Sequence, residues 1–557
     1  MLKNSILRTN RIRVTTSQIR SCSAKPLSKA KKASKLSPHG GPSFQHFLAN
    51  SDFQTKSSSI RRTPEDVIPY INEKLISGQG QKVFLDVYGC QMNVNDTEVV
   101  WSILESKGYS RTLDKSQADV WLLVTCSIRE GAESRVWNVL QGIRNSSRQG
   151  TYKKSLRIGL LGCMAERLKD KMLNTDLVDI VAGPDSYRDL PRLLAITEHS
   201  SQAASNVMLS LDETYADVKP SRLNQDSVTG FVSIQRGCDN MCAYCIVPFT
   251  RGRERSRPLQ TILDEVKYLV DSGVKEVTLL GQNVNSYRDT REESLTIFNT
   301  KFDSNLAKGF KTVYKPKLGG LRFADLLEKV SEIDPELRIR FTSPHPKDFP
   351  DEVLYLIKEK SNICNQLHLP AQSGSTKILE NMRRGYSRES YLALVDHVKS
   401  IIPGVRLTGD MIAGFCGETD QDFRDTLTLI EKVQYGQLYT FSYSMREKTS
   451  AHRKLVDDVE EKVKLARTAQ MSDLTHSIAK KMNEKLIGTQ QLVLIEGDSK
   501  RSKDHFQGRS DGYIKTILPK SPGLKPGDYV QVQITDTTSL TLKGSIVKKS
   551  SLREFNK

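Results

Sequence analysis

The chain has 557 residues, enough for about three domains. Hydrophobic residues make up 37% of it, the mean hydropathy is −0.45, and no apolar run reaches the ~18 residues of a membrane span. Nine cysteines over this length do not make a disulfide scaffold, and their placement suggests metal ligation in a reducing compartment.

The net charge of +18 is concentrated at the N-terminus. Residues 1–51 hold ten Lys or Arg and no Asp or Glu, which leaves +8 for the remaining chain. A basic, Ser-rich, acid-free start is typical of an organelle transit peptide. We interpret residues 1–80 as a mitochondrial transit peptide with a disordered linker. Plastid import, a cytoplasmic fraction, and a basic arm that touches nucleic acid are the alternatives.

Residues 81–200 alternate strands with helices, which predicts an α/β domain with a parallel sheet. The expected strands are Val83–Tyr88, Val120–Thr125, Arg157–Leu161 and, as a fourth candidate, Asp179–Ala182. The expected helices lie near Asp96–Lys107, Glu130–Arg144 and Ala165–Leu173.

Three cysteines, Cys90, Cys126 and Cys163, each follow one of these strands. The carboxyl ends of parallel strands meet at one edge of the sheet, where ligands gather. The three thiols could therefore converge as a cluster site. The alternative is three ordinary buried cysteines.

Residues 224–480 show six further strand candidates separated by helices, which predicts an open, partial (βα)6 barrel whose functional groups lie on the loops after the strands. The strands are Phe231–Gln235, Glu276–Leu280, Arg338–Thr342, Gln366–Leu369, Arg406–Met411 and Leu438–Ser442. The helices are Thr261–Ser272, Phe323–Glu332, Asp351–Lys360, Arg388–Ile401 and Thr419–Val433, and Thr419 with Asp422 resembles a capping box.

A CxxxCxxC triplet, Cys238, Cys242 and Cys245, follows the first strand of this barrel. Three thiolates without a fourth nearby suit an iron–sulfur cubane with one iron open to substrate. Structural zinc normally takes four protein ligands. A zinc site and three buried thiols are the alternatives.

Residues 483–549 read as short alternating strands with turn signals, which predicts a small β-barrel. From Gly488 to Lys549 the net charge is +4, which suits a nucleic-acid backbone as well as a plain solvated basic face.

Together these segments resemble the radical S-adenosylmethionine (SAM) methylthiotransferases. The resemblance rests on Tyr88–Asn93, Thr125–Glu130, Leu161–Glu166 and Arg236–Pro258, and on Leu494–Gly497 and Gly508–Arg509 of a TRAM-like barrel. The sequence Cys126-Ser127-Ile128-Arg129-Glu130 is similar to the tRNA branch that acts on isopentenyladenosine, and Ser343–Pro350 and Gly414–Thr419 are similar to its animal mitochondrial members.

The resemblance implies two [4Fe–4S] clusters and SAM. Cys238, Cys242 and Cys245 would hold the cluster that cleaves SAM to a 5′-deoxyadenosyl radical, and Cys90, Cys126 and Cys163 an auxiliary cluster that presents sulfur. The substrate would be the adenosine beside the tRNA anticodon, extruded from the stacked loop. The reaction also needs an electron donor and a sulfur source.

Further residues are predicted more loosely. Gln282, Asn283 and Asp410 at strand ends are candidate SAM contacts or simple loop hydrogen bonders. Arg251, Arg253, Arg255 and Arg257 could meet phosphates or form a basic loop that stabilises the cluster and the SAM carboxylate. No catalytic proton is assigned to His345 or His368, and Cys364 and Cys416 are expected to be unligated. Aromatic residues of 287–320 (Tyr287, Phe298, Phe302, Phe310, Tyr314) could stack bases or belong to a plain insertion.

Three other functions remain open from the sequence. One is a threonylcarbamoyladenosine-directed tRNA methylthiotransferase. A second is a non-catalytic regulator that binds a cyclin-dependent kinase activator, a role suggested only by the original name of the animal branch. The third is a zinc-stabilised RNA-binding protein.

Overall fold

The computed structural model describes residues 75–128, 130–200, 203–291, 309–311 and 319–556, which lie in one compact unit, Pro69–Lys557. The predicted transit segment lies outside the described residues as far as residue 74. No helix among the described residues is long and apolar enough to cross a bilayer.

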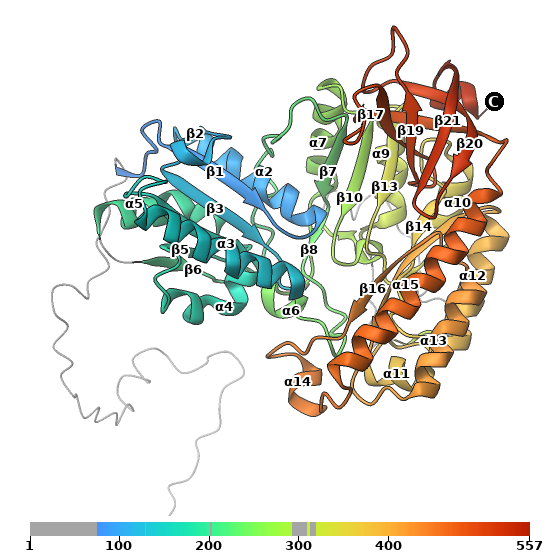
Figure 1. Ribbon diagram of the computed structural model, residues 1–557, viewed down its shortest axis with the longest axis horizontal. Helices are drawn as coiled ribbons and strands as arrows, with labels where there is room; N and C mark the ends of the chain where they lie inside the picture. The colour runs from blue at the N-terminus through green and yellow to red at the C-terminus, as the bar shows by residue number, and fades with distance from the viewer. Residues whose placement is uncertain (1–74, 129, 201–202, 292–308, 312–318, 557) are drawn as a thin grey trace, which may run out of the picture. The chain divides into compact units, whose positions relative to one another are not determined.

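The N-terminal domain is a parallel sheet in the order β2-β1-β3-β4-β5-β6, with helices on both faces (Figure 1). Helices α2 and α5 pack on one apolar face, and α3 and α4 pack on the other. The strands are β1 (Lys82–Val87), β2 (Ser110–Arg111), β3 (Val120–Thr125), β4 (Arg157–Gly162), β5 (Ile180–Ala182) and β6 (Ala204–Asn206); the helices are α2 (Gln91–Glu105), α3 (Glu130–Arg148), α4 (Cys163–Leu173) and α5 (Leu190–His199).

The four predicted strands of this domain are confirmed, and their burial explains why their apolar runs were recognisable in the sequence. Every residue of β3 and β4 is buried, as expected for central parallel strands covered on both faces. The edge strands β2 and β6 were not predicted, because two or three residues carry too little pattern. Helix α2 begins five residues earlier than expected, since its first turn is polar yet buried at Asn93 and Asn95.

The second part of the chain contains six parallel strands, and all six predictions are confirmed. They form two sheets, β13-β10-β7 and β14-β15-β16, that one parallel bridge joins at Ile339 and Ile363. The strands are β7 (Thr229–Ser233), β10 (Glu276–Leu280), β13 (Arg338–Phe341), β14 (Gln366–His368), β15 (Arg406–Ala413) and β16 (Gln437–Ser442). The covering helices are α7 (Leu259–Asp271), α9 (Phe323–Ile333), α10 (Asp351–Glu359), α12 (Arg388–Ile401), α13 (Asp420–Val433) and α15 (Glu461–Glu484).

Local signals set some of these boundaries. The capping box predicted for α13 is present, because the Thr419 hydroxyl accepts from Asp422 N–H while the Asp422 carboxylate accepts from Thr419 N–H. Two small two-stranded sheets were not predicted, and they connect loops that follow β7 and β10. They are formed by β8 (Gln235–Arg236) with β9 (Arg255–Ser256) and by β11 (Arg288–Asp289) with β12 (Leu321–Arg322).

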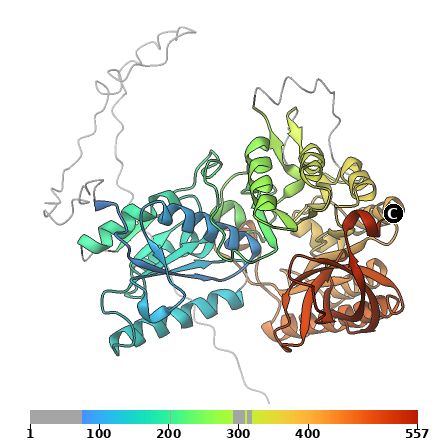
Figure 2. The ribbon, with the colours of Figure 1, turned by 90° about the horizontal axis from the view of Figure 1, so that it is seen from above.

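The C-terminal domain is a closed five-stranded barrel in the order β17-β18-β19-β21-β20 (Figure 2), which confirms the small β-barrel predicted there. It comprises β17 (Gln490–Asp498), β18 (His505–Ser510), β19 (Lys515–Pro519), β20 (Tyr529–Thr537) and β21 (Thr541–Ser550). It packs on the amino ends of the parallel strands, where Arg338 donates to Arg509 O (2.9 Å) and the Tyr529 hydroxyl donates to Lys275 O (2.9 Å). The carboxyl ends of those strands, and the loops after them, are therefore left clear of it.

Candidate cluster site

Cys90, Cys126 and Cys163, called here the N-terminal triad, follow the adjacent strands β1, β3 and β4. Gly89 has a positive φ of +125°, and a Cβ there would lie 2.5 Å from the Cys126 Cβ, so only glycine permits this approach. A hydrogen bond with Cys126 lowers the pKa of the half-buried Cys90 thiol. The thiols of Cys90 and Cys126 are therefore in contact with each other. Cys163 lies close enough that its charge raises the pKa of the Cys126 thiol.

Cys238, Cys242 and Cys245, called here the barrel triad, lie on the loop after β7 and β8. Gly237 has φ +76°, and a Cβ there would lie 2.0 Å from Arg253 O, because the loop folds back on residues 252–253. Cys238 N–H donates to Gly252 O (3.3 Å), which fixes this return. Burial raises the pKa of the Cys238 thiol, and the nearby Cys245 and Cys242 raise it further.

The fold brings the two triads next to each other. Helix α4 begins at Cys163 and packs on α6 (Val247–Thr250), which follows Cys245 after a single residue. Burial and the negative charge of Cys242 raise the pKa of the Cys245 thiol, and Cys163 adds to this effect from the other triad. The sequence predicted each triad, but not that they would share one site.

Three cysteine thiols at each site are the donor type that iron–sulfur clusters take. Among the described residues, no three His, Cys, Asp or Glu side chains surround a position suited to one metal ion. A cubane does not require that, because each cysteine binds a different iron atom at its own corner. Each triad also has a buried guanidinium on one thiol, since Arg251 donates to Cys163 Sγ (3.2 Å) and Arg384 donates to Cys242 Sγ (3.4 Å).

Arg251 connects the two parts of the chain at this site. Its Nε donates to Cys163 Sγ (3.2 Å) and its Nη2 to Asp96 Oδ2 (2.6 Å). The other carboxylate oxygen of Asp96 accepts from Arg236 Nη1 (2.7 Å). All three side chains are almost fully buried.

The four-arginine segment is therefore mostly not a phosphate-binding surface. Arg251, Arg255 and Arg257 are buried in ion pairs with Asp96, Asp185 and Glu265 respectively. Arg253 differs, since its side chain is 67% exposed while its Nε lies 3.0 Å from Asp239. Each buried arginine of this segment instead has its own carboxylate partner: Asp96 and Asp185 belong to the N-terminal domain, and Glu265 lies on α7.

Arg384 was not predicted and has no sequence motif of its own. It follows α11 (Thr376–Asn381), and its Nη1 donates to Cys242 Sγ (3.4 Å). Its Nη2 donates to Pro370 O (3.0 Å) and its Nε to the Tyr386 hydroxyl (2.9 Å). The barrel triad thus has a fixed, buried cation of its own.

Two of the three candidate SAM contacts, Gln282 and Asn283, follow the carboxyl end of β10, whereas Asp410 lies within β15, three residues before its end. The contacts that each side chain already makes within the protein also differ. The Gln282 side-chain oxygen accepts from Gly237 N–H (2.6 Å), which supports the triad loop. Asn283 donates to Asp348 (2.9 Å) and accepts from His345 N–H (2.9 Å), so its amide is already engaged. Asp410 pairs with His368 (3.1 Å) and keeps 27% of its side chain exposed.

The remaining predictions concern His345, the aromatic candidates for base stacking, and the two cysteines outside the triads. Burial and Arg384 lower the pKa of His345 far below its usual value, so this ring is neutral. Tyr287 and Phe310 are buried in the core and are not available for base stacking. The other three aromatic candidates, Phe298, Phe302 and Tyr314, lie outside the described residues. Cys364 and Cys416 are buried elsewhere, beside Arg340 and Tyr443 respectively.

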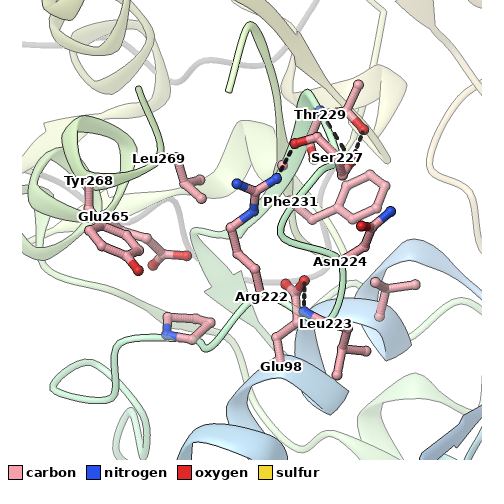
Figure 3. Close-up of a pocket in the computed structure, with 13 residues that line it drawn as sticks. Glu98, Arg222, Leu223, Asn224, Ser227, Thr229, Phe231, Glu265, Tyr268 and Leu269 are labelled. Atoms are coloured by element: carbon pink, nitrogen blue, oxygen red, sulfur yellow. Dashed lines mark hydrogen bonds between the residues drawn. The ribbon is translucent and has the colours of Figure 1, made fainter. Parts of the chain in front are cut away.

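A cavity of about 120 Å³ lies away from the six cysteines, between α2, α7, the start of β7 and the segment 220–227 (Figure 3). Its lining includes Glu98, Arg222 and Glu265, and no cysteine. Small-molecule sites usually enclose about 300–1,000 Å³, so this cavity is too small for SAM or a nucleobase.

Three family models match the chain in consecutive segments. They are the uncharacterized protein family UPF0004 over residues 82–183, the radical SAM superfamily over 232–430, and the TRAM domain over 484–547. These segments coincide with the N-terminal sheet, the partial barrel and the closed barrel described above.

Curated relatives are similar along nearly the whole chain. The mitochondrial tRNA methylthiotransferase CDK5RAP1 of Mus musculus is 55% identical and covers 92% of this chain and 89% of its own. A CDK5RAP1-like protein of Caenorhabditis elegans is 50% identical, with 94% and 95% covered. The tRNA-2-methylthio-N(6)-dimethylallyladenosine synthase of Chloroherpeton thalassium is 47% identical, with 84% and 96% covered.

Proposed function

Because this chain belongs to the family of radical SAM tRNA methylthiotransferases, we propose that it converts N6-isopentenyladenosine beside the anticodon of mitochondrial tRNAs to its 2-methylthio derivative. The names of the relatives support both halves of this statement. The mouse relative is named mitochondrial and acts on tRNA, and the bacterial relative is named for the 2-methylthio-dimethylallyladenosine product. Dimethylallyl and isopentenyl denote the same five-carbon group here.

The observation that carries the proposal is the adjacency of the two cysteine triads, which the contact of α4 with α6 brings about. As a radical SAM protein the chain uses SAM and a [4Fe–4S] cluster, which we assign to Cys238, Cys242 and Cys245. We assign a second cluster, which presents the sulfur, to Cys90, Cys126 and Cys163. When bound, these groups supply radical chemistry at an aromatic C–H that has no acidic proton for a base to remove.

The chain's own residues hold and shield these groups. Arg251 and Arg384 each place a cation on one cysteine thiol, and Gln282 braces the barrel loop through Gly237. We propose Asp410 as a direct SAM contact because its carboxylate is partly accessible. We also propose Gln282 and Asn283 as SAM contacts. Their hydrogen bonds within the protein hold the surrounding loops in place.

We propose that the tRNA anticodon loop enters from the carboxyl ends of the strands, which the C-terminal barrel leaves clear. Single-stranded loops are where proteins read RNA by base, and the target base must leave the stack to reach the clusters. The chemistry also requires an electron donor and a sulfur source as partners. A kinase-activator protein stays a separate prediction, independent of this site.

Nucleoside mass spectrometry of mitochondrial tRNA, with and without the protein, tests this function. Loss of 2-methylthio-N6-isopentenyladenosine with accumulation of its unthiolated precursor is the expected result. Wild type should restore the product, Cys242→Ala should not, and Cys364→Ala, a buried cysteine outside both triads, should restore it. Unchanged levels of both nucleosides would refute the substrate; loss of 2-methylthio-threonylcarbamoyladenosine instead would identify the alternative tRNA substrate.

A further inference from the structure

Arg251 has an unusual position for a residue of the barrel, because it contacts a ligand cysteine of the other domain. It follows α6, close after the barrel triad in sequence, yet its Nε donates to Cys163 Sγ of the N-terminal triad at 3.2 Å. Only 3% of the residue is exposed. Its contact therefore lies in a region of low dielectric, where a charge-assisted hydrogen bond is strongest.

Two nitrogens of the Arg251 guanidinium, Nε and Nη2, have hydrogen-bond partners in the protein, and the third, Nη1, has none among the described residues. Nη2 is fixed by Asp96, which Arg236 holds in turn. Nη1 is buried and has no hydrogen-bond partner among the described residues. A buried unpartnered N–H is costly and calls for an acceptor. The acceptor at this place would be a sulfur atom of the group that Cys163 ligates.

We propose that Arg251 is a positioning residue that raises the reduction potential of the auxiliary cluster from across the domain boundary. This inference rests on the proposed function, since it requires a cluster on Cys90, Cys126 and Cys163. Reduction adds negative charge to a cluster, and a cation that hydrogen bonds to its sulfur ligands stabilises that added charge. Hydrogen bonds to the sulfurs are among the features that set such potentials.

Arg384 provides the matched comparison, because it contacts the other triad only. Its Nη1 lies 3.4 Å from Cys242 Sγ, and its other hydrogen-bond partners are Pro370, Tyr386 and Tyr244. Removing each arginine should therefore affect one cluster and spare the other. Arg255 gives a second control, since it is equally buried in the same segment but pairs with Asp185 and has no cysteine among its hydrogen-bond partners.

The test uses the full-length chain in which Cys238, Cys242 and Cys245 are replaced by Ala, so that only the auxiliary cluster is present. After anaerobic reconstitution with iron and sulfide, the cluster is titrated with reductant and followed by electron paramagnetic resonance. We expect Arg251→Gln to make one-electron reduction at least tenfold less favourable, a shift of about 59 mV to lower potential. Arg251→Lys keeps the positive charge but loses the planar set of guanidinium donors, so it should shift the reduction potential less. Arg384→Gln and Arg255→Lys should leave it unchanged.

Each other outcome decides against the proposal in a different way. An unchanged potential in Arg251→Gln with full iron content would overturn it, as would an equal shift in Arg384→Gln. Loss of iron from both Arg251 variants would show a role in assembly instead of potential, and would also overturn it. If the parent chain with the intact N-terminal triad binds no iron, the two-cluster function itself fails and the inference falls with it.

Discussion

Asp96 of helix α2 and Arg251 of the barrel loop form a buried ion pair with 2.6 Å between Oδ2 and Nη2. Asp96 is fully buried, and burial alone would raise its pKa. The charges of Arg251 and Arg236 outweigh that effect and hold the pKa of Asp96 below its usual value. The carboxylate is therefore charged, and it clamps the N-terminal sheet to the barrel beside the cysteines.

Replacing this carboxylate should destabilise the fold. Asp96→Asn leaves Arg251 and Arg236 buried without their anion, and breaking a buried pair from one side costs about 3–5 kcal/mol. Denaturant unfolding of wild type and variant measures the difference. Asp420→Asn is the control, since Asp420 pairs with Arg467 but its side chain is 82% exposed, and we expect a change of about 0.5 kcal/mol or less. Equal effects of the two substitutions would contradict the clamp.

Gly237→Ala should displace the barrel triad. The new Cβ would meet Arg253 O at 2.0 Å, so the loop that carries Cys238 must move. Gly273→Ala is matched for backbone strain, because Gly273 also has a positive φ (+86°) but has nothing within 4 Å of a Cβ. Both variants bear about 1–2 kcal/mol of left-handed strain. Only Gly237→Ala should lose iron from the barrel triad on anaerobic reconstitution; equal iron content in the two would refute the steric argument.

Glu98 should make stability depend on pH. Burial raises its pKa to about 7 from an ordinary value of 4.5, so the native state binds the proton more tightly than the unfolded state. Its contribution is fully present below about pH 4.5 and is lost as the pH rises to about 7, by an amount on the order of 1–3 kcal/mol.

Glu98→Gln keeps an oxygen to accept from Leu223 N–H and removes the titration. The variant should lose less stability than wild type between pH 4.5 and 8, as unfolding midpoints at several pH values would measure. Glu166, whose pKa burial also raises to about 7, contributes equally to both proteins, so the difference isolates Glu98. Glu359→Gln, an exposed position on α10, should follow the wild-type profile. A profile of Glu98→Gln parallel to wild type would contradict the prediction.

Arg253 should contribute to tRNA binding where its buried neighbours do not. Its side chain is 67% exposed beside the barrel triad. If it meets a phosphate, Arg253→Ala should weaken binding and reduce the slope of log affinity against log salt by about one. Binding of the anticodon stem–loop at several salt concentrations measures both. Arg424→Ala, exposed on α13, is the control and should leave the slope unchanged; the same slope in both variants would remove Arg253 from the interface.

Much of the fold could be predicted from local pattern. The buried strands β3 and β4 and the six barrel strands are continuous or alternating apolar runs with turn residues after them, so their existence follows from short-range sequence. The placement of Cys90, Cys126 and Cys163 together follows from one rule of parallel sheets, that the strands end at a common edge. The glycines before Cys90, Cys163 and Cys238 all take positive φ, a signal that the sequence also contained.

The sequence alone therefore determined the order of the main strands and helices, the two cysteine triads and a small C-terminal β-barrel, since each follows from local patterns of residues. Only the tertiary structure decided that Arg251 serves Cys163 rather than a phosphate, that Arg384 lies on Cys242, and that the two triads are neighbours. Arg251 and Asp96 are 155 positions apart, and Arg384 and Cys242 are 142 apart. Pairing of buried charges at such separations is set by how the domains pack, and no local pattern of residues encodes it.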